Sequence, residues 1–248
     1  MSVLITGGTK GIGLAIARRL APTHGRVVLA YHSDEAAAQA AKAEIAATGA
    51  AVEIVRGDVG TIDGAAALIA EVEAQGRGLA HIVHSAAMIY PTTLLGADLV
   101  HFRRAMETNG LSLLYLVHAA QNLLGEGSSV VFITSTGSRI PLANYGALGI
   151  GKAMAEATIR YLVAELAPRG VRINAVAPGL VHTTSVAAMV GSEATAAAVV
   201  ERAARANPSG RASRDSDYAS LVEYLLSPDA AFIQGQVIGA NGGASVIG

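Results

Sequence analysis

A hydroxyl, a phenol and an ammonium group lie close together in one segment of the sequence. Ser135 follows the apolar run 130–134, and Tyr145 and Lys152 follow within the next glycine- and alanine-rich stretch. A phenol beside a lysine is a plausible proton donor, because a nearby cation lowers the pKa of the phenol. The segment therefore predicts a site at which a substrate oxygen receives a proton or a hydrogen bond.

The spacing between the phenol and the ammonium indicates which type of reduction the site suits. Leu148, one helical turn before Lys152, has no proton to donate, whereas Tyr145 precedes Lys152 by two turns. At about 1.5 Å per residue, the axial offset grows from roughly 6 Å to roughly 10.5 Å. When an α,β-unsaturated thioester is reduced at its β-carbon, charge develops on an oxygen three atoms away, so the donor must lie farther out than in ketone reduction. The spacing favours enoyl thioester reduction; alternatively, Tyr145 only packs and the site is inactive.

A glycine-rich loop lies near the start of the chain, in Thr6-Gly7-Gly8-Thr9-Lys10-Gly11-Ile12-Gly13. It directly follows a strand pattern and precedes a helical pattern. Gly7, Gly11 and Gly13 allow the backbone to approach a phosphate and the helix to pack close to the strand. The helix N-terminus then receives the pyrophosphate charge. In this context the loop predicts a dinucleotide site rather than an ordinary glycine turn.

The end of the second expected strand bears on the choice of dinucleotide. Sheets that bind NAD usually place an acid there to hold the ribose diol. This strand ends at Ala30-Tyr31-His32, and the first acid is Asp34. Lys10 could meet a 2′-phosphate, with His32 and Ser33 nearby. We therefore expect NADPH to be preferred over NADH, with a solvated surface role for Lys10 as the alternative.

Polar or small residues end the third and fourth expected strands. Asp58 could accept a hydrogen bond from the adenine amino group, or it could cap the next helix. The small residues Ser85, Ala86 and Ala87 would let the backbone line the cofactor. His84 is expected to be a hydrogen-bonded structural residue rather than a base.

Two further parts of the sequence contain candidate site residues. Asn109 lies inside a helical pattern, where an amide usually needs a hydrogen-bond partner. Pro178-Gly179 follow the sixth strand, and Thr183 comes shortly after them. Ligands bind near the carboxyl ends of the strands in such sheets, so a turn and a hydroxyl there fit a ligand site.

Strand and helix patterns alternate along the whole chain. Strands without polar alternation indicate a parallel sheet that helices cover on both faces. We expect one α/β domain over residues 1–248, a Rossmann-type doubly wound parallel sheet of about seven strands. The expected strands are Val3–Thr6, Val27–Tyr31, Ala51–Arg56, Ala80–Ser85, Ser129–Thr134, Val171–Val176 and Gln236–Gly239. The expected helices are Gly11–Ala21, Glu35–Ala47, Ile62–Gln75, Asp98–Leu124, Tyr145–Ala167, Thr184–Ala206 and Asp215–Leu226.

Composition excludes several classes of function. Hydrophobic residues make up 52% of the chain and charged residues 15%, as in a globular protein. A net charge of −1 argues against bulk nucleic-acid binding. Without cysteine, the chain has neither disulfides nor iron–sulfur clusters, and its single histidines lack metal-ligand spacing. With no apolar run of about 18 residues and no signal-peptide pattern, a cytoplasmic protein without a membrane span is expected.

With these residues in hand, the chain resembles the short-chain dehydrogenase/reductase superfamily from end to end. The match includes the glycine loop, Asp58, Asn109, Ser135, Lys152, Pro178-Gly179 and the C-terminal Gly235-Gln236-Val237 and Gly242-Gly243. Within it, Tyr145 and Lys152 meet the Tyr-x6-Lys pattern of the NADPH-dependent enoyl-acyl-carrier-protein reductases. The departures are His84 and Ser85 in place of two asparagines, Pro141 where an aromatic residue is common, and no basic residue after the second strand.

The resemblance implies a role for each matching position. Tyr145 would stabilise the enolate or donate its proton, and Lys152 would hold the nicotinamide ribose. The implied catalytic set is Tyr145, Lys152, Ser135 and Asn109. The implied cofactor set is Gly7, Thr9, Lys10, Gly11, Ile12, Gly13, His32, Asp58, Val59, Ser85, Ala86, Ala87, Lys152, Pro178, Gly179, Val181 and Thr183. The implied substrate contacts are Tyr145, Met88 and Met189.

Partners follow from the same resemblance. The substrate would be an acyl thioester on an acyl carrier protein. Apart from the resemblance, the segment of about 183–210 follows Pro178-Gly179 and is expected to form a substrate lid. Arg202 and Arg205 share a helical face there, on which an acidic carrier protein could dock, with a solvated helix face as the alternative. The apolar helices at 98–124 and 145–167 favour a homotetramer or a dimer. The rival functions are carbonyl reduction of the 3-ketoacyl type and a catalytically silent cofactor-binding scaffold.

Overall fold

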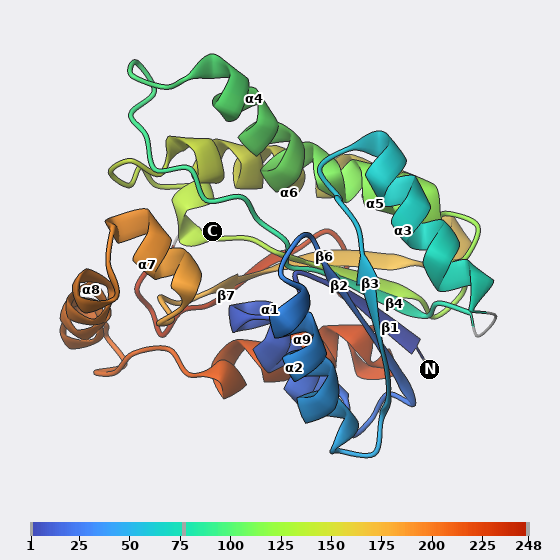
Figure 1. Cartoon of the computed structure of the whole chain (residues 1–248). Helices are drawn as coiled ribbons and strands as arrows, with labels where there is room; N and C mark the ends of the chain where they lie inside the picture. The colour runs from blue at the N-terminus through green and yellow to red at the C-terminus, as the bar shows by residue number, and fades with distance from the viewer. Residues whose placement is uncertain (1, 76–77, 247–248) are drawn as a thin grey trace.

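A computed structural model describes residues 2–75 and 78–246. Its centre is a parallel sheet in the order β3-β2-β1-β4-β5-β6-β7, shown in Figure 1. The order runs outwards from β1 in one direction and then outwards from β4 in the other, which is the doubly wound arrangement predicted from the sequence. The strands are β1 (Ser2–Thr6), β2 (Arg26–Tyr31), β3 (Ala51–Arg56), β4 (His81–His84), β5 (Ser129–Ile133), β6 (Arg172–Pro178) and β7 (Val237–Ala240).

Helices cover both faces of the sheet (Figure 1). On one face, apolar residues of α3, α5 and α6 form a core with the strands; on the other, α1, α2 and α9 do so. The α-helices are α1 (Gly11–Leu20), α2 (Glu35–Ala46), α3 (Ile62–Ala74), α4 (Leu99–Met106), α5 (Ser112–Ala120), α6 (Gly146–Leu166), α7 (Thr184–Val190), α8 (Glu193–Ala206) and α9 (Asp215–Leu226). Short 3₁₀ turns are η2 (Thr136–Ser138), η3 (Ala167–Arg169) and η4 (Pro228–Ala230), and η1 (Glu107–Leu111) is π-helical.

The inner strands are mostly apolar because helices cover both faces of the sheet. Every residue of β2 is buried, as is every residue of β1, β4, β5 and β6. Such strands read as continuous apolar runs rather than alternating patterns. Since ladders in a parallel sheet bring the strand ends to one edge, the glycine loop after β1 and Ser135 after β5 lie along the same carboxyl edge.

The helix expected over Asp98–Leu124 is observed from Leu99 to Ala120, with a π-helical turn inside it. It is α4, then the π-helical turn η1, then α5, which ends at Ala120. The wider turn places the Asn109 side chain inward, where it bonds the backbone of Met88 and Ala147. Single π-helical turns inside α-helices often mark functional sites. A smooth helical pattern in the sequence cannot reveal such an inserted residue.

The helix expected over Thr184–Ala206 is also divided, into α7 and α8. Gly191 ends α7 in the left-handed conformation, with φ of 92°. Ser192 then caps α8, since its side chain accepts a hydrogen bond from the Thr195 N–H. Both are ordinary stop and start signals, and the sequence-based prediction of one continuous helix there was wrong.

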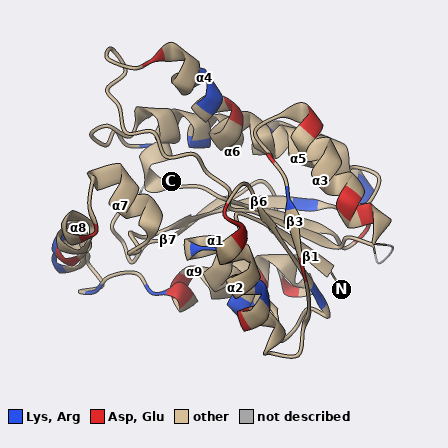
Figure 2. Ribbon diagram, in the orientation of Figure 1, with Lys and Arg blue, Asp and Glu red and all other residues tan. Residues whose placement is uncertain are grey.

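Charged residues of both signs are spread over the helical layers (Figure 2). α8, for example, carries both acidic and basic residues, and its Arg205 pairs with Glu201. Among residues 2–75 and 78–246, no helix is long and apolar enough to cross a membrane.

Two histidines of β4 are buried without charge. The Nδ1 of His84 lies 2.5 Å from the Thr6 hydroxyl and its Nε2 lies 2.7 Å from the Ser112 hydroxyl, confirming the structural role expected for it. His81 packs edge-on against the ring of His24. Burial lowers the pKa of His81 to about 4 and that of His84 to about 3. Charging either imidazole in the folded state is therefore unfavourable.

These depressed pKa values predict acid sensitivity. The unfolded chain binds protons at these histidines from about pH 6.5 downwards, whereas the folded chain does not, so stability falls as the pH drops from about 7 to about 4. For His81 alone the loss is on the order of 3 kcal/mol. Urea unfolding at a series of pH values measures it. His81→Phe should flatten this part of the profile, and an unchanged slope in that variant would contradict the assignment.

Candidate active site

Ser135 and Tyr145 meet at the carboxyl edge of the sheet. Ser135 follows β5 and caps η2, with its Oγ accepting from the Gly137 N–H at 3.1 Å. Tyr145 stands at the N-cap of α6, just before the helix rather than within it, and its hydroxyl lies 3.0 Å from Ser135 Oγ. The Ser135 oxygen accepts hydrogen bonds from the Gly137 N–H and from the Tyr145 hydroxyl, so the hydrogen of its own hydroxyl can bond a ligand. The predicted pair of hydroxyls is brought together.

Glycines hold the ring of Tyr145 in this place. A β-carbon on Gly137 would lie 2.5 Å from Cε1 of the tyrosine, and one on Gly149 would lie 2.4 Å from the Gly137 carbonyl oxygen. Real side chains never approach so closely, so any larger residue at either position must displace the turn or the ring. The small residues around Tyr145 therefore fix the position of its hydroxyl.

The environment of the phenol differs from the sequence-based expectation. Burial raises the pKa of Tyr145, and its hydrogen bond with Ser135 offsets this only in part. The lowering of this pKa that was expected from Lys152 is not found, and burial of the phenol has the largest effect on it. A phenol that keeps its hydrogen at neutral pH is suited to donate a hydrogen bond to developing negative charge.

Lys152 lies inside the protein, against the end of β5. Its side chain is 4% exposed, its Nζ donates to the Ile133 carbonyl oxygen at 2.8 Å, and the ammonium sits 4.3 Å from the centre of the Phe132 ring. Burial lowers the pKa of Lys152 to about 7, although the nearby Glu156 carboxylate acts against this. The ammonium therefore gains or loses its proton near neutral pH, which makes it a candidate functional group.

Asn109 is held entirely by backbone groups. Its Oδ1 accepts from the Met88 N–H at 2.8 Å, and its Nδ2 donates to the carbonyl oxygens of Met88 at 2.9 Å and Ala147 at 3.3 Å. The amide thus links the segment after β4 to the first turn of α6. In this structure Asn109 positions other parts of the site, and its bonds do not reach Ser135, Tyr145 or Lys152.

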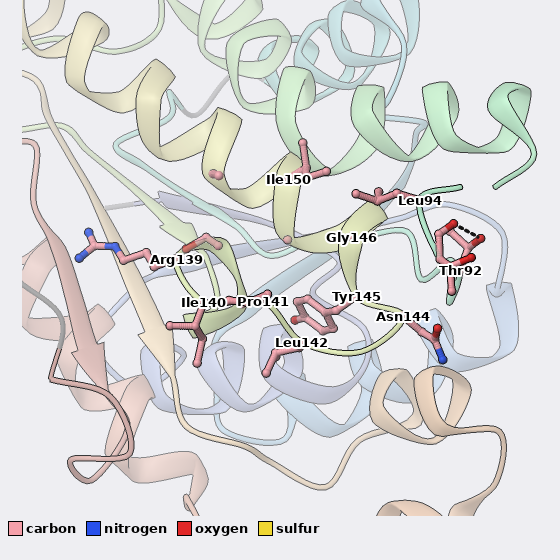
Figure 3. A pocket seen from close by; sticks show the side chains of 15 residues that line it. Thr92, Leu94, Arg139, Ile140, Pro141, Leu142, Asn144, Tyr145, Gly146 and Ile150 are labelled. Atoms are coloured by element: carbon pink, nitrogen blue, oxygen red, sulfur yellow. Dashed lines mark hydrogen bonds between the residues drawn. The ribbon is translucent and has the colours of Figure 1, made fainter. Parts of the chain in front are cut away.

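A cavity of about 420 Å³ opens beside Tyr145 (Figure 3). Apolar side chains from three segments line it: Leu94, Ile140 to Leu142, and Ile150 on α6. Leu142 is 46% exposed and Ile150 43% exposed, so apolar surface around the cavity stays uncovered. Neither Met88 nor Met189 is among the described residues that line it. Of the apolar lining residues, the sequence pointed only to Pro141. Leu94, Ile140 and Leu142 lie in loops, whose side chains carry no periodic signal, and Ile150 lies within the apolar helix α6.

The glycines of the loop after β1 allow neighbouring backbone segments to approach the loop closely. A β-carbon on Gly7 would lie 2.9 Å from the Cα of Ala86, and one on Gly13 would lie 2.2 Å from the Gly7 carbonyl oxygen. Gly11 adopts φ of 49° and faces Thr183, whose side chain caps α7. The loop after β1 and the segments after β4 and β6 therefore converge at one place, as a dinucleotide cradle requires.

The other residues expected at the cofactor lie along the same edge. Ser85 and Ala86 donate through their N–H groups to the backbone oxygen and the hydroxyl of Thr6. The Gly179 N–H bonds the Ala240 carbonyl oxygen, which ties the turn after β6 to β7. Thr9 and Val59 are buried, Ile12 and Val181 are partly buried, and Ala87 is exposed.

Two ion pairs lie at the end of the carboxyl edge formed by β2 and β3. Lys10 pairs with Asp34, and each side chain is about half exposed. Asp58 pairs with Arg104 and lies 3.8 Å from His32. The alternative that Asp58 caps the following helix was wrong, since Thr61 caps α3. Lys10 and His32, both expected at a 2′-phosphate, lie at this end.

Arg56 is a basic residue beside the end of the second strand, where the sequence has none directly after that strand. It ends β3 and pairs in register with Tyr31, the last residue of β2. Its Nε donates to the His32 carbonyl oxygen at 3.1 Å. The search for a cation after the second strand missed it because the residue comes from the neighbouring strand. Only the pairing of two expected strands could have pointed to it.

Within the described ranges, no group of three histidine, aspartate or glutamate side chains is placed to hold a metal ion.

Comparisons with known proteins agree with this geometry. The family model described as "Enoyl-(Acyl carrier protein) reductase" matches residues 7–245. The chain is 31% identical to 1-cyclohexenylcarbonyl-CoA reductase of Streptomyces collinus, covering 98% of this chain and 86% of that protein. It is 29% identical to 3-oxoacyl-(acyl-carrier-protein) reductase FabG of Staphylococcus aureus, covering 98% and 97%.

A solved structure shares both the fold and part of the sequence. It is a short-chain dehydrogenase from Burkholderia cenocepacia in complex with NADP, with a TM-score of 0.88, 28% identity, and coverage of 98% of this chain and 97% of that one. The glycine cradle, the Ser135–Tyr145 pair and the buried Lys152 lie within the range that the family model matches. The chain belongs to the short-chain dehydrogenase/reductase superfamily, in the family described as enoyl-(acyl carrier protein) reductase, and is an NAD(P)-dependent oxidoreductase.

Proposed function

We propose that this protein reduces the C=C bond of an α,β-unsaturated acyl thioester with NADPH. The observation that carries the proposal is the position of the phenol. Tyr145, two turns before Lys152, reaches Ser135, while Leu148, one turn before Lys152, is buried in α6 and has no proton to give. The donor therefore stands outward of the place that a one-turn tyrosine would occupy, which suits charge on the thioester oxygen of an enolate rather than charge on an oxygen bound to the carbon that is reduced.

The residues at the carboxyl edge fit a nicotinamide dinucleotide, because a side chain at Gly7 or Gly13 would close the cradle. When bound, such a group supplies the hydride. We assign its phosphates to the glycine loop and Thr183, its nicotinamide ribose to Lys152, and its adenosine end to Asp58, Val59 and the 2′-phosphate cations. The remaining proposed contacts are Thr9, Ile12, Ser85, Ala86, Ala87, Pro178, Gly179 and Val181.

The hydroxyl groups of Ser135 and Tyr145 are proposed to donate hydrogen bonds to the substrate oxygen. Ser135 and Tyr145 carry hydroxyl hydrogens that can rotate to meet a thioester oxygen entering between them. Two such donors stabilise the enolate charge more in the transition state than in the bound substrate. Tyr145 retains its hydrogen at neutral pH because its pKa is raised. The proton that finally reaches the substrate comes from this hydroxyl or from water.

The acyl group is proposed to occupy the cavity beside Tyr145. Its apolar lining from Leu94, Ile140, Leu142 and Ile150 would be covered by such a group. Residues 183–210, with α7 and α8, begin next to the glycine loop and are proposed as the lid. Met189 on α7 and Met88 after β4 remain proposed substrate contacts from outside the cavity lining.

The thioester carrier and the assembly are also proposals. An acidic carrier protein would meet Arg202 and Arg205 on α8, although Glu201 already pairs with Arg205. A coenzyme A thioester is the alternative, as in the name of the Streptomyces relative. Exposed apolar residues on α4 and α6, such as Leu99, Val100 and Tyr161, support a dimer or tetramer.

The test compares two thioesters of equal length. Purified enzyme is given crotonyl and acetoacetyl thioesters side by side, each on coenzyme A and on carrier protein, and NADPH oxidation is followed by absorbance. We expect turnover with the crotonyl substrates and little with the acetoacetyl ones. Turnover of acetoacetyl thioesters alone would favour the rival carbonyl reduction. No turnover with any of them, despite NADPH binding, would favour the silent scaffold.

Cofactor preference has its own test. NADPH should be used with a higher kcat/KM than NADH, because Lys10, Arg56 and His32 lie at the end of the carboxyl edge where the adenosine is proposed to bind. Lys10→Glu should lower kcat/KM for NADPH about tenfold or more and leave NADH little changed, since the new charge repels a 2′-phosphate. The existing Lys10–Asp34 pair is exposed and contributes little to stability. A wild-type preference for NADH would contradict the proposal and assign Asp34 to the ribose.

A further inference from the structure

Glu156 is a buried carboxylate one helical turn after Lys152 on α6, and the proposed reaction does not use it. Its side chain is 4% exposed. Oε1 accepts from the Thr134 hydroxyl and from the Ser138 hydroxyl, each at 2.6 Å. Oε2 lies 3.4 Å from Nε of Arg139. A buried carboxylate is costly unless such partners surround it, so this position has a specific structural requirement for a charged acceptor.

The two hydroxyl partners stand on either side of Ser135. Thr134 immediately precedes it, and Ser138 closes η2 and lies 2.7 Å from the Ser135 carbonyl oxygen through its Oγ. Glu156 thus connects both ends of the turn to α6, the helix that begins beside Tyr145 and carries Lys152. We propose that Glu156 is a positioning residue that holds the Ser135 hydroxyl at hydrogen-bond distance from the Tyr145 hydroxyl.

The turn packs closely against Tyr145 and Gly149, but its opposite side is not close-packed. A second cavity of about 150 Å³ separates Ser135 and η2 from Val237, Gly239 and Asn241 near β7, and Glu156 borders it. On that side the turn has space beside it instead of close-packed side chains. The bonds to Glu156 are therefore among the contacts that resist displacement of Ser135 towards this space.

A second route of action must be separated from this one. The carboxylate also faces Lys152 and favours its charged form, while His84 on β4 lies near the same ammonium. If Glu156 acted through Lys152, its removal would shift the pH at which activity is lost. If it acts through Ser135, its removal lowers kcat at every pH and depends on the presence of the Ser135 hydroxyl.

The test is a double-mutant cycle in the full-length enzyme, and it rests on the proposed use of Ser135. Glu156→Gln keeps the size of the side chain and is expected to lower kcat about 10- to 100-fold, with the KM for crotonyl thioester and the Kd for NADPH changed less than about threefold. In a Ser135→Ala background the same substitution should change kcat less than about twofold. Glu165→Gln, on the exposed side of the same helix, is the matched control and should have no effect.

Each other result has a defined meaning. Full activity of Ser135→Ala would contradict the proposed function itself. A loss with Ser135→Ala but none with Glu156→Gln, or equal losses from Glu156→Gln in both backgrounds, would overturn the positioning role. So would a shifted pH profile with an unchanged plateau kcat, which assigns Glu156 to Lys152. If Glu156→Gln fails to fold, Ser138→Ala removes one bond of the set and should lower kcat several-fold only while Ser135 is present.

Discussion

Tyr145→Phe is expected to lower kcat for an enoyl thioester by on the order of 10²–10³, which is the usual loss when one preorganised donor to an oxyanion is removed. The phenylalanine ring still fits against Gly137 and Gly149, because only the hydroxyl is lost. The fold and the cofactor cradle should stay intact, so the Kd for NADPH should remain within about twofold. Stopped-flow reduction of crotonyl thioester and fluorescence titration with NADPH measure the two quantities.

The position of the phenol, rather than its presence, is tested by moving it. Leu148→Tyr combined with Tyr145→Phe places a phenol one turn before Lys152, at a position that is now buried. The expected result is continued loss of enoyl reduction, with any recovered activity directed to ketones. Near-full enoyl activity in Tyr145→Phe would show that the two-turn donor is not part of the reaction.

Much of the fold could be predicted because its signals are local. Continuous apolar runs mark the covered strands, and each observed strand lies within two residues of its expected bounds. The glycine loop could be predicted because its glycines occupy positions that other residues do not tolerate. Gly13 leaves no room for a side chain, and Gly11 has positive φ. The doubly wound order follows from alternating strands and helices.

The site itself depends on contacts between segments, and these have no local signal. The hydrogen bond between Tyr145 and Ser135 depends on how the chain folds at η2, and the raised pKa of the phenol follows from its burial there. Arg56 reaches His32 only because β2 and β3 are neighbours. The π-helical turn at Asn109 inserts one residue into an otherwise regular helical pattern, so the sequence predicts a continuous helix.

Lys152 is the second residue whose loss should have a large effect. Replacing Lys152 with alanine should lower kcat by on the order of 10² and weaken NADPH binding about tenfold, since a charged hydrogen-bond donor beside the proposed ribose site is removed. Lys152→Met keeps much of the side-chain volume over Phe132 and separates the loss of charge from the loss of packing. Both variants are measured by NADPH fluorescence titration and steady-state kinetics.

The pH profile gives an independent check on the same residue. Because burial lowers the pKa of Lys152 to about 7, the ammonium is present below that pH and is lost as the pH rises through it. If the cation is required, kcat/KM of the wild type should be highest below about pH 7 and fall above it. In Lys152→Met this fall should disappear, leaving a low and flat profile. A wild-type fall that persists in Lys152→Met would show that another group titrates, and unchanged turnover and NADPH affinity would remove Lys152 from the site.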